Sequence, residues 1–266
     1  MRLDLIQPDH LTASEVSVLS RICETESVEL LQRLVRIDTV NPPGNVDAAI
    51  EVCRQVLAGA GFLCRIAQLE AGKPNLIATF GSGTGPTLCL NAHLDVVPVG
   101  DLTAWISPPF AAEIRDGRVF GRGALDDKAS IVAQVMAGVA IARSGIEIAG
   151  NLIINSVADE EIGGPAGAAL IVGGRHVVPD YVIVGEPTMN RVCVGERGGG
   201  LIRIEVRGRT AHGALPWEGA NAIEGMAVVI AALRSELWPR LEDRTHPLFH
   251  HSSASVNIIE GGLKDN

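Results

Sequence analysis

The sequence predicts an α/β fold in which a sheet is flanked by helices, followed by a smaller α+β domain. Short runs of Val, Ile and Leu, typical of buried strands, alternate with longer segments of helical periodicity. Residues 87–95 and 151–157 are the clearest strands, and 127–144 is the clearest helix, with Gly145 just past its end. Strands that alternate with helices favour a layered α/β domain.

Four further segments complete the expected first domain, which we place at residues 1–193. Residues 26–37 and 45–60 carry apolar positions at helical spacing, and the break DTVNPPGN between them cannot continue a helix. Residues 74–80 form another apolar run, and the turn-forming stretch GSGTGP separates it from the next strand. The run YVIVG at 181–185 reads as a last buried strand.

The character of the sequence changes in the expected second domain, residues 194–266. Residues 198–208 alternate apolar and charged positions, which predicts a strand with one exposed face. A helix is expected from about 219 to 237, and a strand at 253–262. These segments indicate one strand–helix–strand piece of a small domain.

Composition restricts the class of protein and its partners. The chain has 266 residues, 47% of them hydrophobic and 20% charged, with a net charge of −9 that argues against nucleic acid and anionic membranes as partners. No secretory signal is visible at the start, and the longest apolar stretch, 131–142, is too short to span a bilayer. The five cysteines lack a C-x-x-C pair, which favours free thiols. We therefore expect a soluble cytoplasmic protein.

Two polar segments indicate a metal site. His93 and Asp95 end an apolar strand two residues apart, so both side chains leave the same face. His93 is a candidate ligand, and Asp95 could fix the tautomer of its imidazole; a core histidine beside a solvated aspartate is the alternative. Asp126 opens a helix, where a carboxylate is also an ordinary cap, and only one of Asp126 and Asp127 is expected to face a metal.

Carboxylates follow two further strands. Glu160 and Glu161 are adjacent, so one could bind a metal while the other takes a proton from water; a solvated acidic turn is the alternative. Glu186 stands just past the strand at 181–185, before a proline. Open α/β sheets place their sites at the carboxyl ends of strands, so the four segments together predict the centre of a metal-dependent hydrolase.

As a set, five motifs resemble the zinc aminoacylase and metallopeptidase family of acetylornithine deacetylase, succinyl-diaminopimelate desuccinylase and carboxypeptidase G. They are NAHLDVVP, GRGALDDK, ADEEIGG, VGEPT and RGRTAHGALPWEGANAI, in the family's order, within residues 25–263. Ala129 departs from the glycine usual after the lysine. The resemblance implies a zinc-peptidase-like catalytic domain with a mixed sheet, and an incomplete ferredoxin-like dimerisation or lid domain.

The resemblance also implies a set of metal ligands. Two divalent ions are expected, Zn²⁺ first and Co²⁺ or Mn²⁺ as alternatives. Asp126 bridges them, His93 and Glu186 complete one site, and Glu161 belongs to the other. The peptide between Asp126 and Asp127 is expected to be cis.

The remaining roles that the resemblance implies concern catalysis and substrate. Glu160 is the general base, while the role of Asp95 behind the histidine ligand follows from its spacing rather than from the resemblance. His212 reaches the active site of the partner subunit in a homodimer and polarises the scissile carbonyl, and Asn257 contacts substrate.

The expected reaction is hydrolysis of the amide bond in an N-acyl amino acid. The alternatives are a dipeptidase or carboxypeptidase of the same family, or an inactive remnant that only binds metal. The family's last histidine ligand would lie beyond residue 266. From the sequence alone, the chain is thus expected to be a truncated form with little activity of its own.

Overall fold

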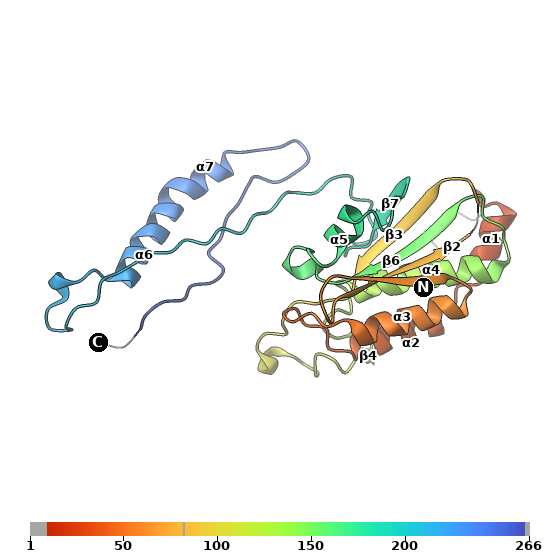
Figure 1. Cartoon of the computed structure of the whole chain (residues 1–266), viewed down its shortest axis with the longest axis horizontal. Helices are drawn as coiled ribbons and strands as arrows, with labels where there is room; N and C mark the ends of the chain where they lie inside the picture. The colour runs from red at the N-terminus through yellow and green to blue at the C-terminus, as the bar shows by residue number, and fades with distance from the viewer. Residues whose placement is uncertain (1–9, 82, 264–266) are drawn as a thin grey trace. The chain divides into compact units, whose positions relative to one another are not determined.

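The computed structural model describes residues 10–81 and 83–263 (Figure 1). The chain divides into two compact units between Arg191 and Val192. That division lies two residues from the boundary expected from the sequence.

A mixed sheet forms the centre of the first unit. Within the described residues its strands lie in the order β1-β2-β6-β3-β7. Strands β6, β3 and β7 are parallel, while β1 and β2 run antiparallel to their neighbours. The bounds are β1 Leu63–Gln68, β2 Pro74–Phe80, β3 Thr87–His93, β6 Asn151–Val157 and β7 Tyr181–Val184, with a separate hairpin of β4 Glu113–Arg115 and β5 Arg118–Phe120.

The loop GSGTGP joins β2 to β3 without making them partners. Strand β6 lies between them and bonds to both, antiparallel to β2 and parallel to β3. The three parallel strands therefore share one edge at their carboxyl ends, where His93 pairs in register with Val157 and Asn91 with Val184. The candidate residues after these strands are brought to that edge.

Helices cover both faces of the sheet (Figure 1). Alternate strand residues such as Leu90 and Ile154 join the larger core with the helices α2 to α4, whereas Cys89 and Ile153 face the smaller core with Ile171 of α5. The helix bounds are α2 Glu24–Val35, α3 Asp47–Gly59, α4 Lys128–Ser144 and α5 Ala168–Gly173, with a short 3₁₀ turn η3 at Leu102–Ala104.

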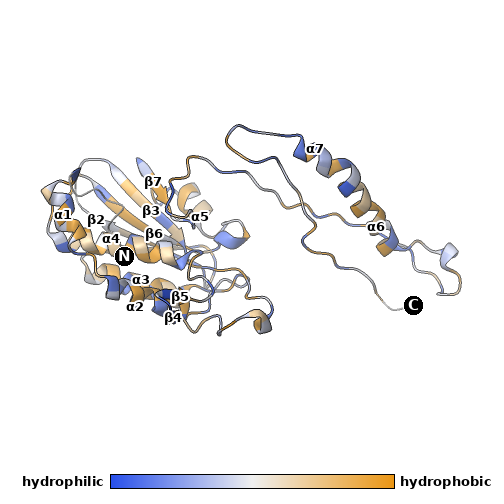
Figure 2. Cartoon of the chain, turned by 180° about the vertical axis from the view of Figure 1, so that it is seen from behind, coloured by the Kyte–Doolittle hydropathy of each residue, from blue (hydrophilic) through white to orange (hydrophobic). Residues whose placement is uncertain are grey.

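Helix α4 connects the core to the site. It is apolar along most of its length (Figure 2), because it packs against both the sheet and its neighbouring helices. It ends at Gly145, whose φ of 70° places it in the left-handed region that favours glycine. Its first residue, Lys128, directly follows the Asp126–Asp127 pair and is fully buried.

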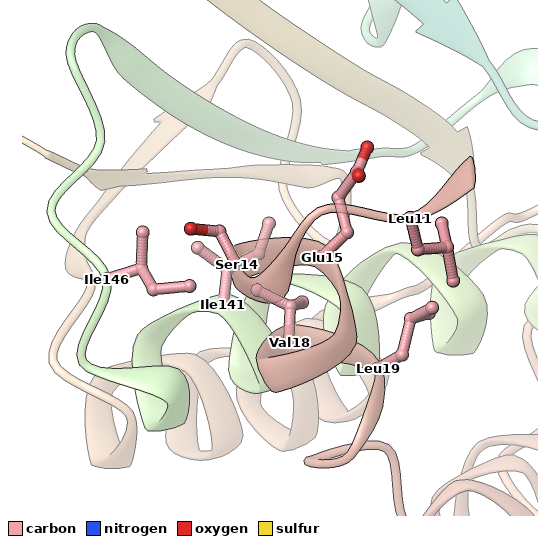
Figure 3. A pocket seen from close by; sticks show the side chains of 7 residues that line it. All are labelled: Leu11, Ser14, Glu15, Val18, Leu19, Ile141 and Ile146. Carbon is pink, nitrogen blue, oxygen red and sulfur yellow. The ribbon is translucent and has the colours of Figure 1, made fainter. Parts of the chain in front are cut away.

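Helix α1 (Ala13–Leu19) begins with a capping box between Thr12 and Glu15. An apolar pocket lies between this helix and the end of α4 (Figure 3). Ile141 and Ile146 line it from the α4 side. Since α4 is 17 residues long, at about 1.5 Å per residue, the pocket is roughly 20 Å from the helix start where the candidate site lies.

The second unit forms the expected helix but not the expected strands. Helix α6 (Ala222–Ala232) is capped by Asn221, whose side chain accepts from the amide of Ile223, and a π-helical turn and α7 follow it. The turn spans Leu233–Leu237 and α7 spans Trp238–Glu242, with a 3₁₀ turn η5 at Pro216–Glu218.

The strands predicted at 198–208 and 253–262 are not formed. Across 192–263, the described part of this unit, the only ladder contacts are isolated bridges, Arg209 with Ala220 and His246 with Phe249. A strand is stable only when it pairs with another backbone, and neither segment finds one here. The ferredoxin-like α+β character expected for this unit is thus not confirmed.

Two further observations concern membrane-spanning helices and the cysteines. None of the helices in the described ranges is both long and apolar enough to cross a membrane. All five cysteines are free, and Cys53 and Cys89 are buried.

Candidate metal centre and active site

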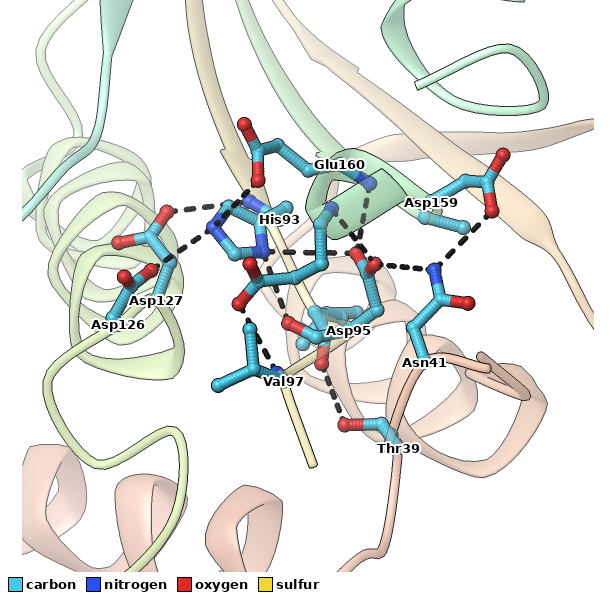
Figure 4. Close-up of polar contacts among 12 residues, drawn as sticks. Thr39, Asn41, His93, Asp95, Val97, Asp126, Asp127, Asp159 and Glu160 are labelled. Carbon is cyan, nitrogen blue, oxygen red and sulfur yellow. Dashed lines mark hydrogen bonds and ion pairs between the residues drawn. The ribbon is translucent and has the colours of Figure 1, made fainter. Parts of the chain in front are cut away.

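His93, the last residue of β3, is the centre of the site (Figure 4). It is 2% exposed. Its Nδ1 lies 3.0 Å from the backbone carbonyl oxygen of Asp95, and its Nε2 lies 3.1 Å from Oδ1 of Asp126 and 3.7 Å from Oε2 of Glu160. When Nδ1–H donates to the Asp95 carbonyl, Nε2 is left to face the carboxylates, as a metal ligand would.

The carboxylates around His93 determine its charge. Burial opposes the imidazolium form, but the hydrogen bond to Asp95 and the charges of Asp127, Asp95 and Glu160 outweigh it and raise the pKa of His93 to about 10. A cation that binds at this imidazole must displace a proton.

The carboxylate of Asp95 lies near His93 and also contacts the turn that follows β6. Its Oδ1 lies 3.6 Å from Nδ1 of His93, farther than its own backbone carbonyl. Its carboxylate instead accepts from the amides of Glu160 at 3.1 Å and Glu161 at 3.2 Å, and from Nδ2 of Asn41 at 2.8 Å. Burial acts to raise the pKa of Asp95, but the contact with His93 and these hydrogen bonds together lower it. Asp95 therefore fixes the Glu160–Glu161 turn as well as the histidine.

Asp126 and Asp127 come immediately before α4, and the peptide between them is cis, which confirms the sequence expectation. Asp126 is exposed, whereas Asp127 is fully buried. Oδ2 of Asp127 accepts from the amide of His93 at 3.3 Å, while its Oδ1 is buried without a hydrogen-bond partner. Burial raises the pKa of Asp127 to about 7.

Two groups of side chains could hold cations. His93, Asp126 and Glu161 form one group, and His93, Asp127 and Glu186 form the other, with all ligand atoms of a group within 4.8 Å of one another. His93 is thus common to the two groups, whereas the family resemblance implied that Asp126 would be shared. The unpartnered buried oxygen of Asp127 and the mixed imidazole and carboxylate donors suit Zn²⁺ and similar ions.

The two glutamates lie in a 3₁₀ turn, η4 (Glu160–Ile162), just past β6. Oε2 of Glu160 approaches His93, and the side chain remains about half exposed. Oε1 of Glu161 accepts from the amide of Val97 at 3.2 Å. Burial is the largest cause that raises the pKa of Glu161, opposed by the charge of His93. Glu160 is therefore placed beside the ligand groups with its carboxylate open to solvent.

Glu186 reaches the site because the end of β7 lies very close to α4. The amide of Gly185 donates to the carbonyl of Asn91 at 2.7 Å. A Cβ on Gly185 would lie 2.5 Å from Cβ of Ser130 and 2.8 Å from Nε2 of Gln134. Only glycine allows this approach, which brings Glu186 next to the start of α4.

Comparisons with known proteins give the family of this site. A family model described as peptidase family M20/M25/M40 matches residues 89–261, which include every candidate residue named above. The chain belongs to this family. Members of the M20 family are metal-dependent, in agreement with the two ligand groups.

Two curated relatives carry the same name. The succinyl-diaminopimelate desuccinylase of Phenylobacterium zucineum is 35% identical over 88% of this chain and 62% of its own length. That of Caulobacter sp. (strain K31) is 37% identical over 89% of this chain and 60% of its own. The chain therefore spans about three fifths of the length of these relatives.

The M20 fold is also seen in solved structures. Human carnosine dipeptidase 1 superposes with a TM-score of 0.55 over 65% of this chain and 41% of its own, at 24% identity. This likeness concerns the fold alone.

His212 and Asn257 belong to the second unit of this M20 chain. Nδ1 of the exposed His212 accepts from the amide of Ala214 at 3.1 Å. Oδ1 of Asn257, also exposed, accepts from the hydroxyl of Ser255 at 2.5 Å. The catalytic role of His212 and the substrate contact of Asn257 stay predictions.

Sequence reasoning missed four polar residues around the site. Asn41 and Asp159 are buried, and Asn41 donates to the carboxylates of both Asp95 and Asp159. Lys73 pairs with Asp159, and Lys128 is fully buried at the start of α4, where it donates to the carbonyl of Leu34. Asp159 stands in the ADEE motif and Lys128 in GRGALDDK, so their place in a motif was a usable signal. Asn41 and Lys73 lie in loops without such a signal.

Proposed function

We propose that this site hydrolyses the amide bond of an N-acyl amino acid, with a succinylated diamino acid such as N-succinyl-diaminopimelate as the first candidate substrate. The observation that carries the proposal is the convergence of His93 with five carboxylates at the carboxyl ends of three parallel strands. The names of the relatives at 35% and 37% identity support the choice of substrate.

The metal is proposed to be a pair of divalent ions, Zn²⁺ in preference to Co²⁺ or Mn²⁺. Asp126 and Glu161 would hold one with His93, and Asp127 and Glu186 the other. Bound ions would supply a Lewis acid that polarises the amide carbonyl and the attacking water. Nε2 of His93 faces Asp126, since Nδ1 is engaged by the carbonyl of Asp95.

Glu160 is the proposed general base. It stands beside both ligand groups but belongs to neither, and its exposed carboxylate can meet a water molecule and a substrate. In this mechanism Oε2 of Glu160 takes a proton from the attacking water and returns it to the departing nitrogen. Asp95 holds the amide of Glu160, so the base is fixed at its backbone.

The second unit contributes a further proposal. His212 would polarise the scissile carbonyl in the site of the partner subunit of a homodimer, and Asn257 would contact the substrate. Mixing two inactive variants, Glu160→Gln and His212→Ala, tests this. Recovery of activity in the mixed dimer supports the exchange of His212 between subunits, and no recovery contradicts it.

Turnover with a panel of substrates tests the proposed reaction. The purified protein, loaded with Zn²⁺, Co²⁺ or Mn²⁺ in turn, is given N-succinyl-diaminopimelate, N-acetylornithine and a dipeptide. We expect the highest kcat/KM with the succinylated substrate. A preference for the dipeptide would assign the site to a peptidase, and bound metal without turnover on any substrate would assign it to a metal-binding remnant.

A further inference from the structure

A fully buried carboxylate that no part of the proposed mechanism uses lies directly before the base. Asp159 has a φ of 68°, and its side chain is held from three separate segments. Oδ1 is 2.6 Å from Nζ of Lys73 and accepts from Nδ2 of Asn41 at 3.2 Å, while Oδ2 accepts from the amide of Ala166 at 3.1 Å. Three contacts therefore hold the side chain of the residue that precedes Glu160.

Asn41 joins this carboxylate to a second one. The same Nδ2 donates to Oδ2 of Asp95 at 2.8 Å and to Oδ1 of Asp159 at 3.2 Å (Figure 4). Both partners are acceptors, so the amide group must present its NH₂ to them. Its Oδ1 is buried without a partner, which shows that the contact with the two carboxylates determines the orientation of the side chain.

The loop after Asn41 makes room for this side chain. Gly44 has a φ of 73°, and a Cβ there would lie 2.7 Å from Cγ of Asn41. Glycine at this position lets the amide lie directly against the turn of the loop.

The two carboxylates hold the same short turn from opposite ends. Asp95 accepts the amides of Glu160 and Glu161, whereas Asp159 is itself the residue before them and is tied to Ala166 beyond the turn. Asn41 connects the two holders, so a shift of either carboxylate would be transmitted to the backbone of the base.

Lys73 supplies the positive charge that faces the buried carboxylate of Asp159. Burial acts to raise the pKa of Asp159, but the bonds from Lys73, Ala166 and Asn41 lower it. Lys73 lies in the loop between β1 and β2, with its side chain 12% exposed, and contacts Glu70 at 3.0 Å on its outer side. Its ammonium thus reaches the turn from outside the catalytic centre.

We propose that Lys73, Asp159 and Asn41, together with Asp95, form a clamp that sets the position of Glu160 for catalysis. Lys73, Asp159 and Asn41 are positioning residues: they act on the backbone of the base and touch neither ligand group. The proposal rests on the proposed function, in which Glu160 is the base, and it specifies which residues outside the ligand set control turnover.

Lys73→Met is the main variant, because it keeps the aliphatic stem and removes the charge near the protein surface. Asn41→Ser removes the bridge directly, at greater risk to folding. Glu70→Gln is the matched control, since it removes the outer partner of the same ammonium and leaves the clamp intact. Lys73→Arg is the conservative rescue, and Asn155→Ala is a control for loss of a buried asparagine, whose Nδ2 donates to the carbonyl of Leu76.

Four quantities are measured on each metal-loaded variant: kcat and KM on the succinylated substrate, metal per chain, and hydrogen exchange of the amides at Glu160, Glu161 and Ala166. For Lys73→Met and Asn41→Ser we expect kcat to fall about 10-fold or more, with KM and metal content unchanged, because partners outside the ligand set typically affect activity by 10–100-fold. The three amides should exchange faster. Glu70→Gln and Asn155→Ala should keep kcat per folded molecule, and Lys73→Arg should recover it.

Several outcomes would overturn the clamp. The first is a Lys73→Met variant with unchanged kcat and unchanged amide exchange. The second is a Glu70→Gln variant that loses as much kcat as Lys73→Met. The third is a loss of bound metal large enough to account for the loss of kcat. Because the exchange measurement needs no substrate, it tests the clamp even if the wild-type protein fails to turn over any acylated amino acid, a result that would contradict the proposed function alone.

Discussion

Replacing Lys128 by methionine should change how the stability of this protein depends on pH. Lys128 is fully buried at the start of α4, where Nζ donates to the carbonyl oxygens of Leu34 at 3.0 Å and Ile37 at 2.8 Å. Burial lowers the pKa of Lys128 to about 8, against a smaller opposing effect of the Asp38 charge. Neutral lysine keeps two N–H groups, so both hydrogen bonds survive its deprotonation.

The size of the effect follows from the two pKa values. Between about 8 and 10.5, the unfolded chain keeps a proton on Lys128 that the folded chain has lost. Because the unfolded state binds more protons in this window, the free energy of unfolding rises with pH. At about 1.4 kcal/mol per pH unit, the whole interval contributes about 3 kcal/mol.

Urea unfolding near pH 7 and near pH 10, with a chelator present, measures this contribution. The stability of wild type minus that of Lys128→Met should increase by about 2–3 kcal/mol between the two conditions. Burial raises the pKa values of Cys53 and Cys89, and both thiols are present in the two proteins; of the two, Cys53 also feels the charge of Lys128. Lys73→Met is the control, because the pKa of Lys73 is raised and its charge persists to pH 10. A constant difference for Lys128→Met would refute the reasoning.

Two further predictions concern metal binding. Because the pKa of His93 is raised to about 10, Zn²⁺ binding near pH 7 should release at least one proton per chain, measured by calorimetry in buffers of different ionisation enthalpy; no release would contradict the place of His93 as ligand. Gly185→Ala, whose Cβ would collide with Ser130, should displace Glu186 and weaken metal binding about 10-fold or more. Gly173→Ala, with open space around the new Cβ, should leave the affinity unchanged, and equal affinities in the two variants would refute the argument from close approach.

The parallel edge of the sheet could be predicted because its signals are local. Each apolar run carries its own polar residue at the end, as His93 does after β3 and Glu186 after β7. Parallel strands bring such ends together whatever their order in the sheet. The order itself was not visible, since β6 inserts between β2 and β3 from a segment about 70 residues away along the chain.

The partners of the site residues could not be predicted for the same reason. The contact of Asn41 with Asp159 spans 118 positions, and no local pattern encodes it. The separate groupings of Asp126 and Asp127 depend on which way each side chain leaves one turn. The strand expected at 198–208 has the right alternation of residues, but alternation describes a surface that fits a sheet and does not supply the neighbouring strand.

The most direct test of the central claim is the turnover number of Glu160→Gln on a succinylated amino acid, with metal per chain as the control. Glu160 lies beside both ligand groups and belongs to neither, so the variant should keep its full metal content. Loss of a general base typically lowers the rate by about 10²–10⁴-fold, and we expect kcat to fall within that range. A metal-loaded variant that retains near-normal kcat would contradict the assignment of Glu160 as the base and the mechanism built on it.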